Sequence, residues 1–404
     1  SSDMAYKNAV NMMAQKQNML AQYPLPAALE KIPDLQRSAP TSYLENEKKY
    51  NVDMKKMEDI AKQLSAVFKN YKYLFNTNVK INGNEITSFR STSEDVNLKL
   101  PHNSVVIKVS ATFEDDNRVK TADDLTLQYE NPDEIPSIDA LVERVRKFAD
   151  DCMEMRNAPV MEEYYKGPVM YEDEAAKQVI TATYLAPDQF YGQQNYTENP
   201  KSLGQKLGKK IIDERISIVN STDKTEYNGE KLYGHYQVDA DGFKPEAELS
   251  IVEKGVFKTM LNRTTPAMYA EKSTANSRLA NSPAQSIPLL GVGTLHVKAD
   301  GTTKDDNMLK TLLKAAKKQK LDYAYVVTTP SGYTSLRLYQ VDVKTGERKL
   351  VKHNRITLPT ESQMKKFAAI SDRPFVSNNV QPYTYSTITP ASIIVGDAEL
   401  TKPV

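Results

Sequence analysis

The sequence predicts an α+β protein with a helical N-terminal segment, a small α/β middle domain and a larger β-rich C-terminal domain. Two observations predict this class. Apolar residues follow a helical period up to about residue 74 and then mostly alternate with a period of two. Beyond residue 157, most segments are short, rich in β-favouring residues and separated by Gly or Asp turns. Helices that cluster apart from strands are typical of α+β folds. We expect the three parts at residues 1–72, 73–157 and 158–404.

The N-terminal segment contains two expected helices. The first covers residues 3–20, and a proline-rich connection follows it. The second covers residues 53–74, because its apolar residues recur at helical spacing. Its stripe consists of Met57, Ile60, Ala61, Leu64, Val67 and Phe68.

The middle domain is expected to combine antiparallel strands with one helix. Residues 79–87 predict a hairpin, since Asn82-Gly83 favours a type I′ turn between two short β-like runs. A further strand is expected at residues 105–113, with a turn at 115–117. Ser137 is the expected N-cap of a helix whose apolar face carries Leu141, Val145, Phe148 and Cys152. Cys152 is the only cysteine, so no intrachain disulfide can form, and its place on that face favours a buried apolar role over a reactive thiol.

The C-terminal domain is expected to begin with a short helix at residues 173–183 and to continue mainly as strands. A second helix is predicted from Asp305, as its cap, to Lys320. The expected strands cover residues 217–219, 236–238, 248–252, 256–261, 323–327 and 389–395.

Composition excludes some function classes. The chain has 53 basic and 52 acidic residues, so it lacks the charge excess that attracts nucleic acid. No apolar run approaches the roughly 20 residues that a membrane span requires. The four histidines are isolated in sequence, and no pair has the spacing that places two ligands on one helix face. Glycine-rich segments at 204–210 and 291–296 depart from the nucleotide-binding patterns and predict turns.

Several segments in the second half of the chain carry a family pattern together. They are Gly167–Ala176, Leu207–Ile211, Ile216–Asn220, Val238–Gly242 and Leu249–Met260. In order and spacing they resemble the C-terminal domain of the TldD/PmbA family, metallopeptidase-related proteins once called modulators of DNA gyrase. The balanced charge of this chain gives the gyrase name no support.

The resemblance also exposes two departures. Catalytic members of the family carry H-E-x-x-x-H where this chain has Tyr171-Glu172-Asp173-Glu174. They also supply a cysteine ligand from a late C-G-K segment, where this chain reads Ile370–Phe375 without cysteine. Because a catalytic zinc site uses three protein ligands, we expect no zinc and no other cofactor here, and zinc only in a catalytic partner. The chain is thus most similar to TldE-like members that lack the zinc motif.

The same pattern suggests a candidate peptide groove. Segment 273–278 corresponds to S-N-G-H-x-R in some relatives, although its glycine and histidine are absent here. The candidate groove residues are Asp239, Asp241, Gly242, Asn276 and Arg278. The alternative is structural: Asp and Gly are the usual residues of a tight turn, and Asn276 and Arg278 would then belong to a satisfied surface loop.

The N-terminal residues carry a second, shorter resemblance. Asp3–Ala9 and Lys16 are similar to an internal helix of a longer family branch with a signal peptide and an additional N-terminal region. This favours an exported or periplasmic protein from which that region is missing.

Three functions remain open at this point. The first is a non-catalytic TldE-like subunit that binds unstructured peptides for a zinc-bearing TldD-like partner, or within a self-dimer. The second is a stand-alone exported protein that binds peptides or another ligand. The third is a peptidase with an atypical site. None of the three functions is expected to involve a nucleic-acid partner or a membrane span.

Overall fold

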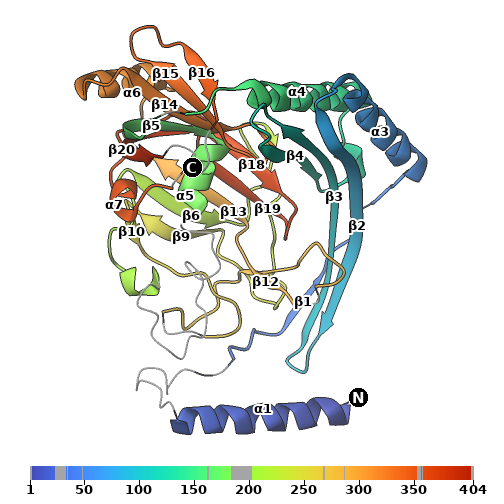
Figure 1. Cartoon of the computed structure of the whole chain (residues 1–404). Helices are drawn as coiled ribbons and strands as arrows, with labels where there is room; N and C mark the ends of the chain where they lie inside the picture. The colour runs from blue at the N-terminus through green and yellow to red at the C-terminus, as the bar shows by residue number, and fades with distance from the viewer. Residues whose placement is uncertain are drawn as a thin grey trace.

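The computed structural model describes residues 2–22, 33, 35–47, 49–161, 163–182, 203–266, 269–285, 287–352, 356 and 358–401. Figure 1 shows a long curved sheet on one side and two further sheets on the other. The mixture of helices with a larger β-rich region confirms the predicted α+β class. None of the described helices has the length and apolar character needed to cross a membrane.

The curved sheet contains four strands. They are β1 (Thr41–Leu44), β2 (Leu74–Ser91), β3 (Val96–Glu114) and β4 (Lys120–Tyr129). Strand β3 pairs antiparallel with β2 and β4, and parallel with β1. Helices α3 (Met54–Ala66) and α4 (Ile138–Asn157) pack with the sheet around one apolar core that includes Leu64, Ile107 and Phe148.

The predicted hairpin at residues 79–87 is wrong. Asn82 and Gly83 lie inside β2, paired with Val106 and Val105 of β3 in an unbroken register. Gly83 serves a close approach instead, because a Cβ atom there would collide with the hydroxyl of Tyr50. Long-range pairing with β3 therefore overrides the local turn preference. The chain reverses only after residue 91, near Asp95, whose φ is 57°.

The two N-terminal helices are confirmed with shifted ends. Helix α1 (Ser2–Gln22) buries none of its residues. Helix α3 is capped by Asp53, which accepts hydrogen bonds from the N–H groups of Lys55 and Lys56. It ends eight residues earlier than predicted, in the 3₁₀ turn η1 (Val67–Asn70), because β2 already begins at Leu74. Although α3 lies in the expected N-terminal segment, it packs on the sheet of the middle domain; the domain limits at 72 and 157 stay predictions.

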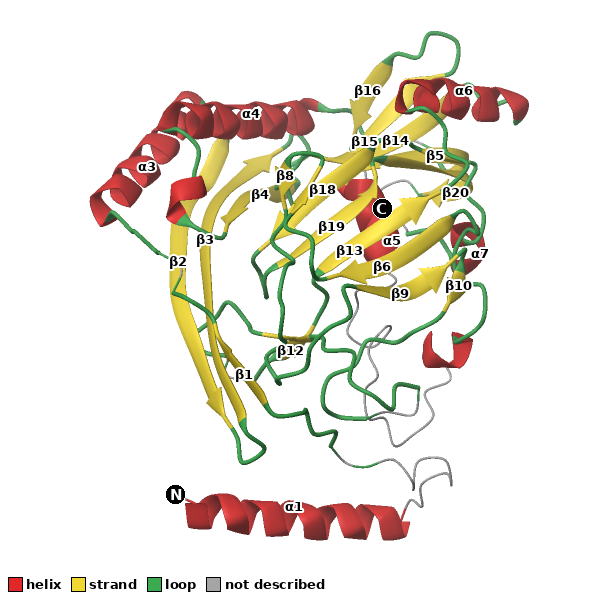
Figure 2. Ribbon diagram, turned by 180° about the vertical axis from the view of Figure 1, so that it is seen from behind, coloured by secondary structure: helices red, strands yellow, loops and turns green. Residues whose placement is uncertain are grey.

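Two six-stranded sheets form the C-terminal part (Figure 2). The first has the order β16-β15-β14-β5-β20-β17 and the second the order β10-β9-β6-β13-β19-β18. The strands of the first are β5 (Tyr165–Asp173), β14 (Tyr323–Thr329), β15 (Arg337–Asp342), β16 (Arg348–Val351), β17 (Ala369–Ile370) and β20 (Ser392–Leu400). Those of the second are β6 (Ile216–Ser221), β9 (Glu248–Glu253), β10 (Val256–Phe257), β13 (Thr294–Ala299), β18 (Pro374–Asn379) and β19 (Tyr385–Pro390).

The main core lies between these two sheets. It includes Val169 and Val327 of the first sheet, Ile218 and Leu295 of the second, and Val179 of helix α5 (Glu174–Ala182). Helix α6 (Met308–Lys318) covers a separate core of the first sheet. The remaining elements are α7 (Glu361–Met364), the short pairs β7 (Glu226–Tyr227) with β8 (Glu230–Lys231) and β11 (Ser277–Arg278) with β12 (Leu289–Leu290), and the 3₁₀ turns η2 (Pro132–Glu134), η3 (Leu203–Lys206) and η4 (Asp305–Asn307).

Several C-terminal predictions need correction. Residues 236–238 form no strand, and only Val256–Phe257 of the segment 256–261 does. The expected strand 389–395 is broken at Ala391, where the chain passes from β19 in one sheet to β20 in the other. Asp305 does not cap α6, because its carboxylate accepts hydrogen bonds from Ser371 and Arg373. The strands at 217–219, 248–252 and 323–327 are confirmed. The helix expected at 173–183 is confirmed from Glu174 to Ala182; Asp173 ends β5 instead, and Thr183 lies outside the described residues.

Candidate functional site

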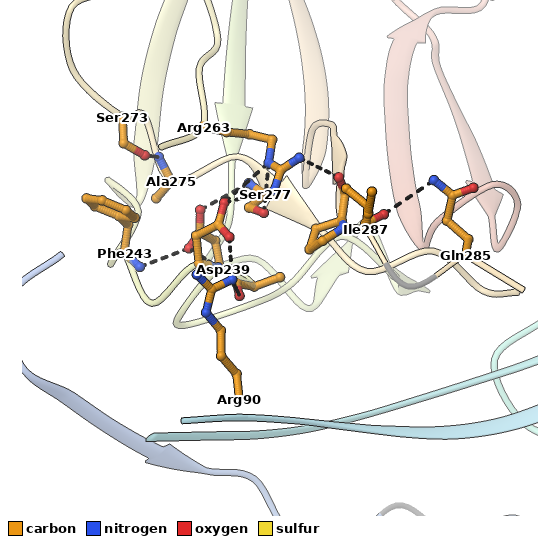
Figure 3. Close-up of polar contacts among 12 residues, drawn as sticks. Arg90, Asp239, Phe243, Arg263, Ser273, Ala275, Ser277, Gln285 and Ile287 are labelled. Atoms are coloured by element: carbon orange, nitrogen blue, oxygen red, sulfur yellow. Dashed lines mark hydrogen bonds and ion pairs between the residues drawn. The ribbon is translucent and has the colours of Figure 1, made fainter. Parts of the chain in front are cut away.

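Asp239 opens a tight turn and holds it together (Figure 3). Its carboxylate accepts hydrogen bonds from the N–H groups of Asp241 at 3.0 Å and Phe243 at 2.9 Å. The other oxygen accepts from the N–H of Ser277 at 3.0 Å, which ties the turn to β11. Gly242, with φ of 93°, takes the left-handed conformation that such a turn requires. Burial raises the pKa of Asp239 to about 6, despite these hydrogen bonds.

Asp241 connects the curved sheet to the C-terminal part. Its side chain is 3% exposed and contacts two arginines. Arg90 of β2 donates to one carboxylate oxygen at 2.7 Å, and Arg263 donates to the other from Nε at 3.2 Å and from Nη2 at 3.1 Å. A carboxylate shared between two guanidinium groups has little capacity left for a ligand.

Asn276 and Arg278 differ in accessibility. Asn276 is fully buried; it donates to the carbonyl of Gly291 at 2.8 Å and accepts from the hydroxyl of Thr274 at 2.7 Å. Arg278 is half-buried and lines a cavity of about 140 Å³. Its guanidinium lies 3.8 Å from the ring centroid of Tyr236 and donates to the carbonyl of Thr384 at 3.1 Å. The structure therefore brings the five candidates together around one turn, but Arg278 is the one that faces this cavity.

A larger cavity of about 600 Å³ lies between the curved sheet and the second C-terminal sheet. Residues 126–129 of β4 and 376–379 of β18 form two of its walls. Ala140 and Arg144 of α4, the loop 331–334 and Glu174 line the rest. No sequence pattern predicts these residues, because β4 and β18 are about 250 positions apart and carry no motif.

Backbone groups of both strands face this cavity region. The N–H of Thr126 donates to Gly332 and the carbonyl of Asp124 accepts from Thr334, so the even-numbered residues of β4 face away from β3. Gln128 is the next residue in that alternation. Beside β18, the N–H of Ala391 donates to the carbonyl of Arg373. Because the bonded positions alternate in an antiparallel pair, residues 373, 375, 377 and 379 are those whose backbones hydrogen-bond toward β19. The backbones of Val376 and Asn378 therefore face away from β19, at the free edge of the sheet.

The start of α5 adds charge beside this cavity. Glu174 lines it and forms an ion pair with Lys177, whose side chain is 10% exposed. Lys177 also donates to the hydroxyl of Ser377 on β18 at 3.1 Å. A buried ammonium needs such partners, and these link α5 to the edge strand.

The residues at the family's metal position do not fit a zinc ion. Counted from Tyr171, the H-E-x-x-x-H pattern would place its second histidine at Ala176, and both residues are buried in the main core. Burial raises the pKa of the Tyr171 hydroxyl far above its ordinary value, so the phenol stays neutral. The described residues contain no group of three or more His, Cys, Asp or Glu side chains placed to hold a metal.

The histidines are also placed for other contacts. Ring nitrogens of His102 and His235 lie 3.2 Å and 2.9 Å from the carbonyls of Ala280 and Thr222, and both rings line the smaller cavity. His296 packs edge-on against Tyr227. His353 lies outside the described residues.

Comparison with known proteins agrees with this fold. The model of the family described as "PmbA/TldA metallopeptidase C-terminal domain" matches residues 165–402. No curated protein was found to match the chain.

Three solved structures share the fold. A protein described as a modulator of a DNA gyrase from Thermotoga maritima is 15% identical, with a TM-score of 0.58 over 91% of this chain and 80% of its own. A protein described as a modulator of DNA gyrase from Bacteroides thetaiotaomicron is 13% identical, with a TM-score of 0.58 over 91% of this chain and 78% of its own. TldE from Thermococcus kodakarensis is 14% identical, with a TM-score of 0.51 over 90% and 79%. Because the family model matches residues 165–402, which is more than half of the chain, the chain belongs to the TldD/PmbA family of metallopeptidase-related proteins.

Proposed function

We propose that this chain is a non-catalytic, TldE-like subunit that binds extended peptides and presents them to a zinc-bearing TldD-like partner. One observation carries the proposal. The 600 Å³ cavity, bordered by the outer edge of β18 and by Gln128 of β4, reaches Glu174, which lies in sequence between Tyr171 and Ala176, the two residues that stand in place of metal ligands.

Binding would occur by strand addition. An extended peptide laid along Val376 and Asn378 would exchange main-chain hydrogen bonds with the β18 edge, and Gln128 offers a second edge across the cavity. Main-chain pairing gives affinity without demanding a particular side-chain sequence, which suits a protein that handles unstructured peptides.

The predicted groove residues take supporting roles in this proposal. Asp239, Asp241, Gly242 and Asn276 fix the turn and the strand β11, and thereby set the position of Arg278. Arg278 is then the member of the group that contacts peptide.

The binding mode is tested with an unstructured peptide carrying a single N-methyl group at each backbone position in turn. A strand-like mode predicts affinity losses at every second position, because alternate N–H groups face the protein edge. Losses spread evenly along the peptide would contradict strand addition.

The location is tested with Ala140→Trp, which adds bulk at an exposed helix position on the cavity wall. It should weaken peptide binding. Ala66→Trp is the matched control, because Ala66 is exposed on α3 and does not line the cavity.

The subunit role is tested by mixing the chain with a zinc-bearing relative and following cleavage of the peptide. Cleavage should exceed that of the relative alone, and Ala140→Trp should reduce the gain without preventing assembly. If this chain binds peptide but adds nothing to cleavage, the stand-alone binding protein replaces the subunit.

A further inference from the structure

Arg278 differs from its neighbours in having no acidic partner. Within the described part of the chain after residue 202, the other arginines each contact a carboxylate, namely Arg215, Arg263, Arg337, Arg348 and Arg373. No described carboxylate lies within ion-pair distance of Arg278, and its Nε is shielded from solvent without a hydrogen-bond partner among the described residues. A half-buried cation without a counter-ion is costly, and an anionic ligand would remove that cost.

The guanidinium is also held in one orientation. It stacks on Tyr236, and the hydroxyl of Tyr236 donates to the carbonyl of Ala275 at 2.7 Å, which fixes the ring. The hydrogen bond from Arg278 Nη2 to the carbonyl of Thr384 fixes one edge of the guanidinium group. A planar, immobilised guanidinium loses little entropy when it forms paired hydrogen bonds with a carboxylate.

The cavity beside Arg278 limits the size and charge of such a ligand. Its volume of about 140 Å³ exceeds the need of a single water and suits one small organic group. Tyr43, Leu100 and Tyr233 give it apolar walls. Glu45 and Glu130 line it as well, and Glu130 is paired with Lys231 at 2.8 Å. These carboxylates would repel a dianion more strongly than a singly charged group.

From this geometry we infer that the cavity at Arg278 binds a carboxylate group, with Arg278 as its counter-ion. This carboxylate comes either from the free C-terminus of a peptide or from a small free carboxylic acid. The peptide source rests on the proposed function. Peptides would then be selected by their C-terminal charge at this cavity, and by their backbone at the strand edges.

Calorimetric titration of the full chain with matched probes tests the inference. The probes are a pentapeptide with a free C-terminal carboxylate, the same peptide as its C-terminal amide, N-acetylalanine and inorganic phosphate. We expect the acid peptide to bind about tenfold or more tightly than the amide, which corresponds to one charge-assisted contact. Arg278→Gln should abolish this difference, and Arg278→Lys should restore part of it.

Two further variants separate binding from misfolding. Leu100→Trp fills the cavity and leaves Arg278 in place, so it should also abolish the preference for the acid peptide. Arg146→Gln removes an exposed cation of α4 that lines neither cavity and should keep the preference. Melting temperatures of all variants identify any that fail to fold.

The possible outcomes distinguish a failure of the carboxylate site from a failure of the peptide-binding function. Equal affinity for the acid and amide peptides overturns the carboxylate site but leaves peptide binding by strand addition intact. Binding of N-acetylalanine that needs Arg278, without binding of either peptide, supports the carboxylate site and overturns the peptide-binding function. Phosphate that binds more tightly than every carboxylate shows that the class of anion is wrong.

Discussion

Arg373 Nη2 lies 2.9 Å from Asp173 Oδ1 and joins the end of β5, directly before α5, to the segment after β17. The resemblance to catalytic relatives places metal ligands in these two segments. The structure brings them side by side, but this chain links them through side-chain charges; Arg373 also donates to Asp305 at 2.7 Å. Both side chains of the Asp173 pair are more than one-third exposed, so the ion pair contributes little free energy.

The first prediction concerns zinc. After dialysis, the purified chain should retain far less than one zinc ion per chain, because three protein ligands are the usual minimum for a catalytic site. Elemental analysis by mass spectrometry measures this. One tightly held zinc per chain that disappears in the double variant His102→Gln, His235→Gln would contradict the prediction.

A second prediction tests the core beneath α4. Phe148 is fully buried, and its ring meets Tyr333 edge-on at a centroid distance of 5.3 Å. Phe148→Ala should lower the free energy of unfolding by about 3–5 kcal/mol, since it removes a large buried side chain and leaves a cavity. Urea denaturation measures the loss. Phe89→Ala, at a 74% exposed position, is the control and should change stability by less than about 0.5 kcal/mol.

The helix around Phe148 was predictable because its signals are local. Ser137 caps it by accepting from the N–H of Ala140, and Leu141, Val145, Phe148 and Cys152 are all buried as the periodicity required. The long strand β2 was not predictable, because its residues 82 and 83 favour a turn. Only the unbroken pairing partner at 105 and 106 keeps them extended.

The candidate site was likewise predictable only in part. The family pattern located the turn at Asp239 and the strand end at Arg278, which the structure joins through the N–H of Ser277. The pattern could not separate the buried members from the one beside the cavity, because that depends on packing of Tyr236 and Thr384. The larger cavity gave no local signal, since two distant strands and one helix create it.

A third prediction concerns the buried ion pair between Asp123 of β4 and Arg337 of β15. Their side chains are 1% and 4% exposed, and Asp123 also accepts a hydrogen bond from the N–H of Ser335. Asp123→Ala should destabilise the protein by about 3–5 kcal/mol, because it leaves a buried guanidinium without its counter-ion.

Chemical denaturation measures this loss against a surface control. Lys166 and Glu399 form an ion pair with both side chains at least half exposed, so Glu399→Ala should cost far less than Asp123→Ala. Similar losses in the two variants would show that burial does not set the strength of the Asp123 pair.

The last prediction concerns pH and His296. Burial, followed by the charges of Lys224 and Lys298, lowers the pKa of His296 to about 4, and its Nδ1 has no hydrogen-bond partner among the described residues. An unfolded histidine titrates near 6.5, so between these values the unfolded state binds more protons and stability falls as pH is lowered. From pH 7 to 5 this amounts to about 2 kcal/mol.

Asp239, with its pKa raised to about 6, acts in the opposite direction, since its carboxyl takes up protons more readily in the folded state. The contribution of Asp239 cancels when the wild type is compared with His296→Gln, because Asp239 is present in both proteins. The wild type should lose about 2 kcal/mol more than the variant between pH 7 and 5 when both are unfolded with urea. Parallel stability curves for the two proteins would mean that His296 is protonated in the folded state as readily as in the unfolded chain.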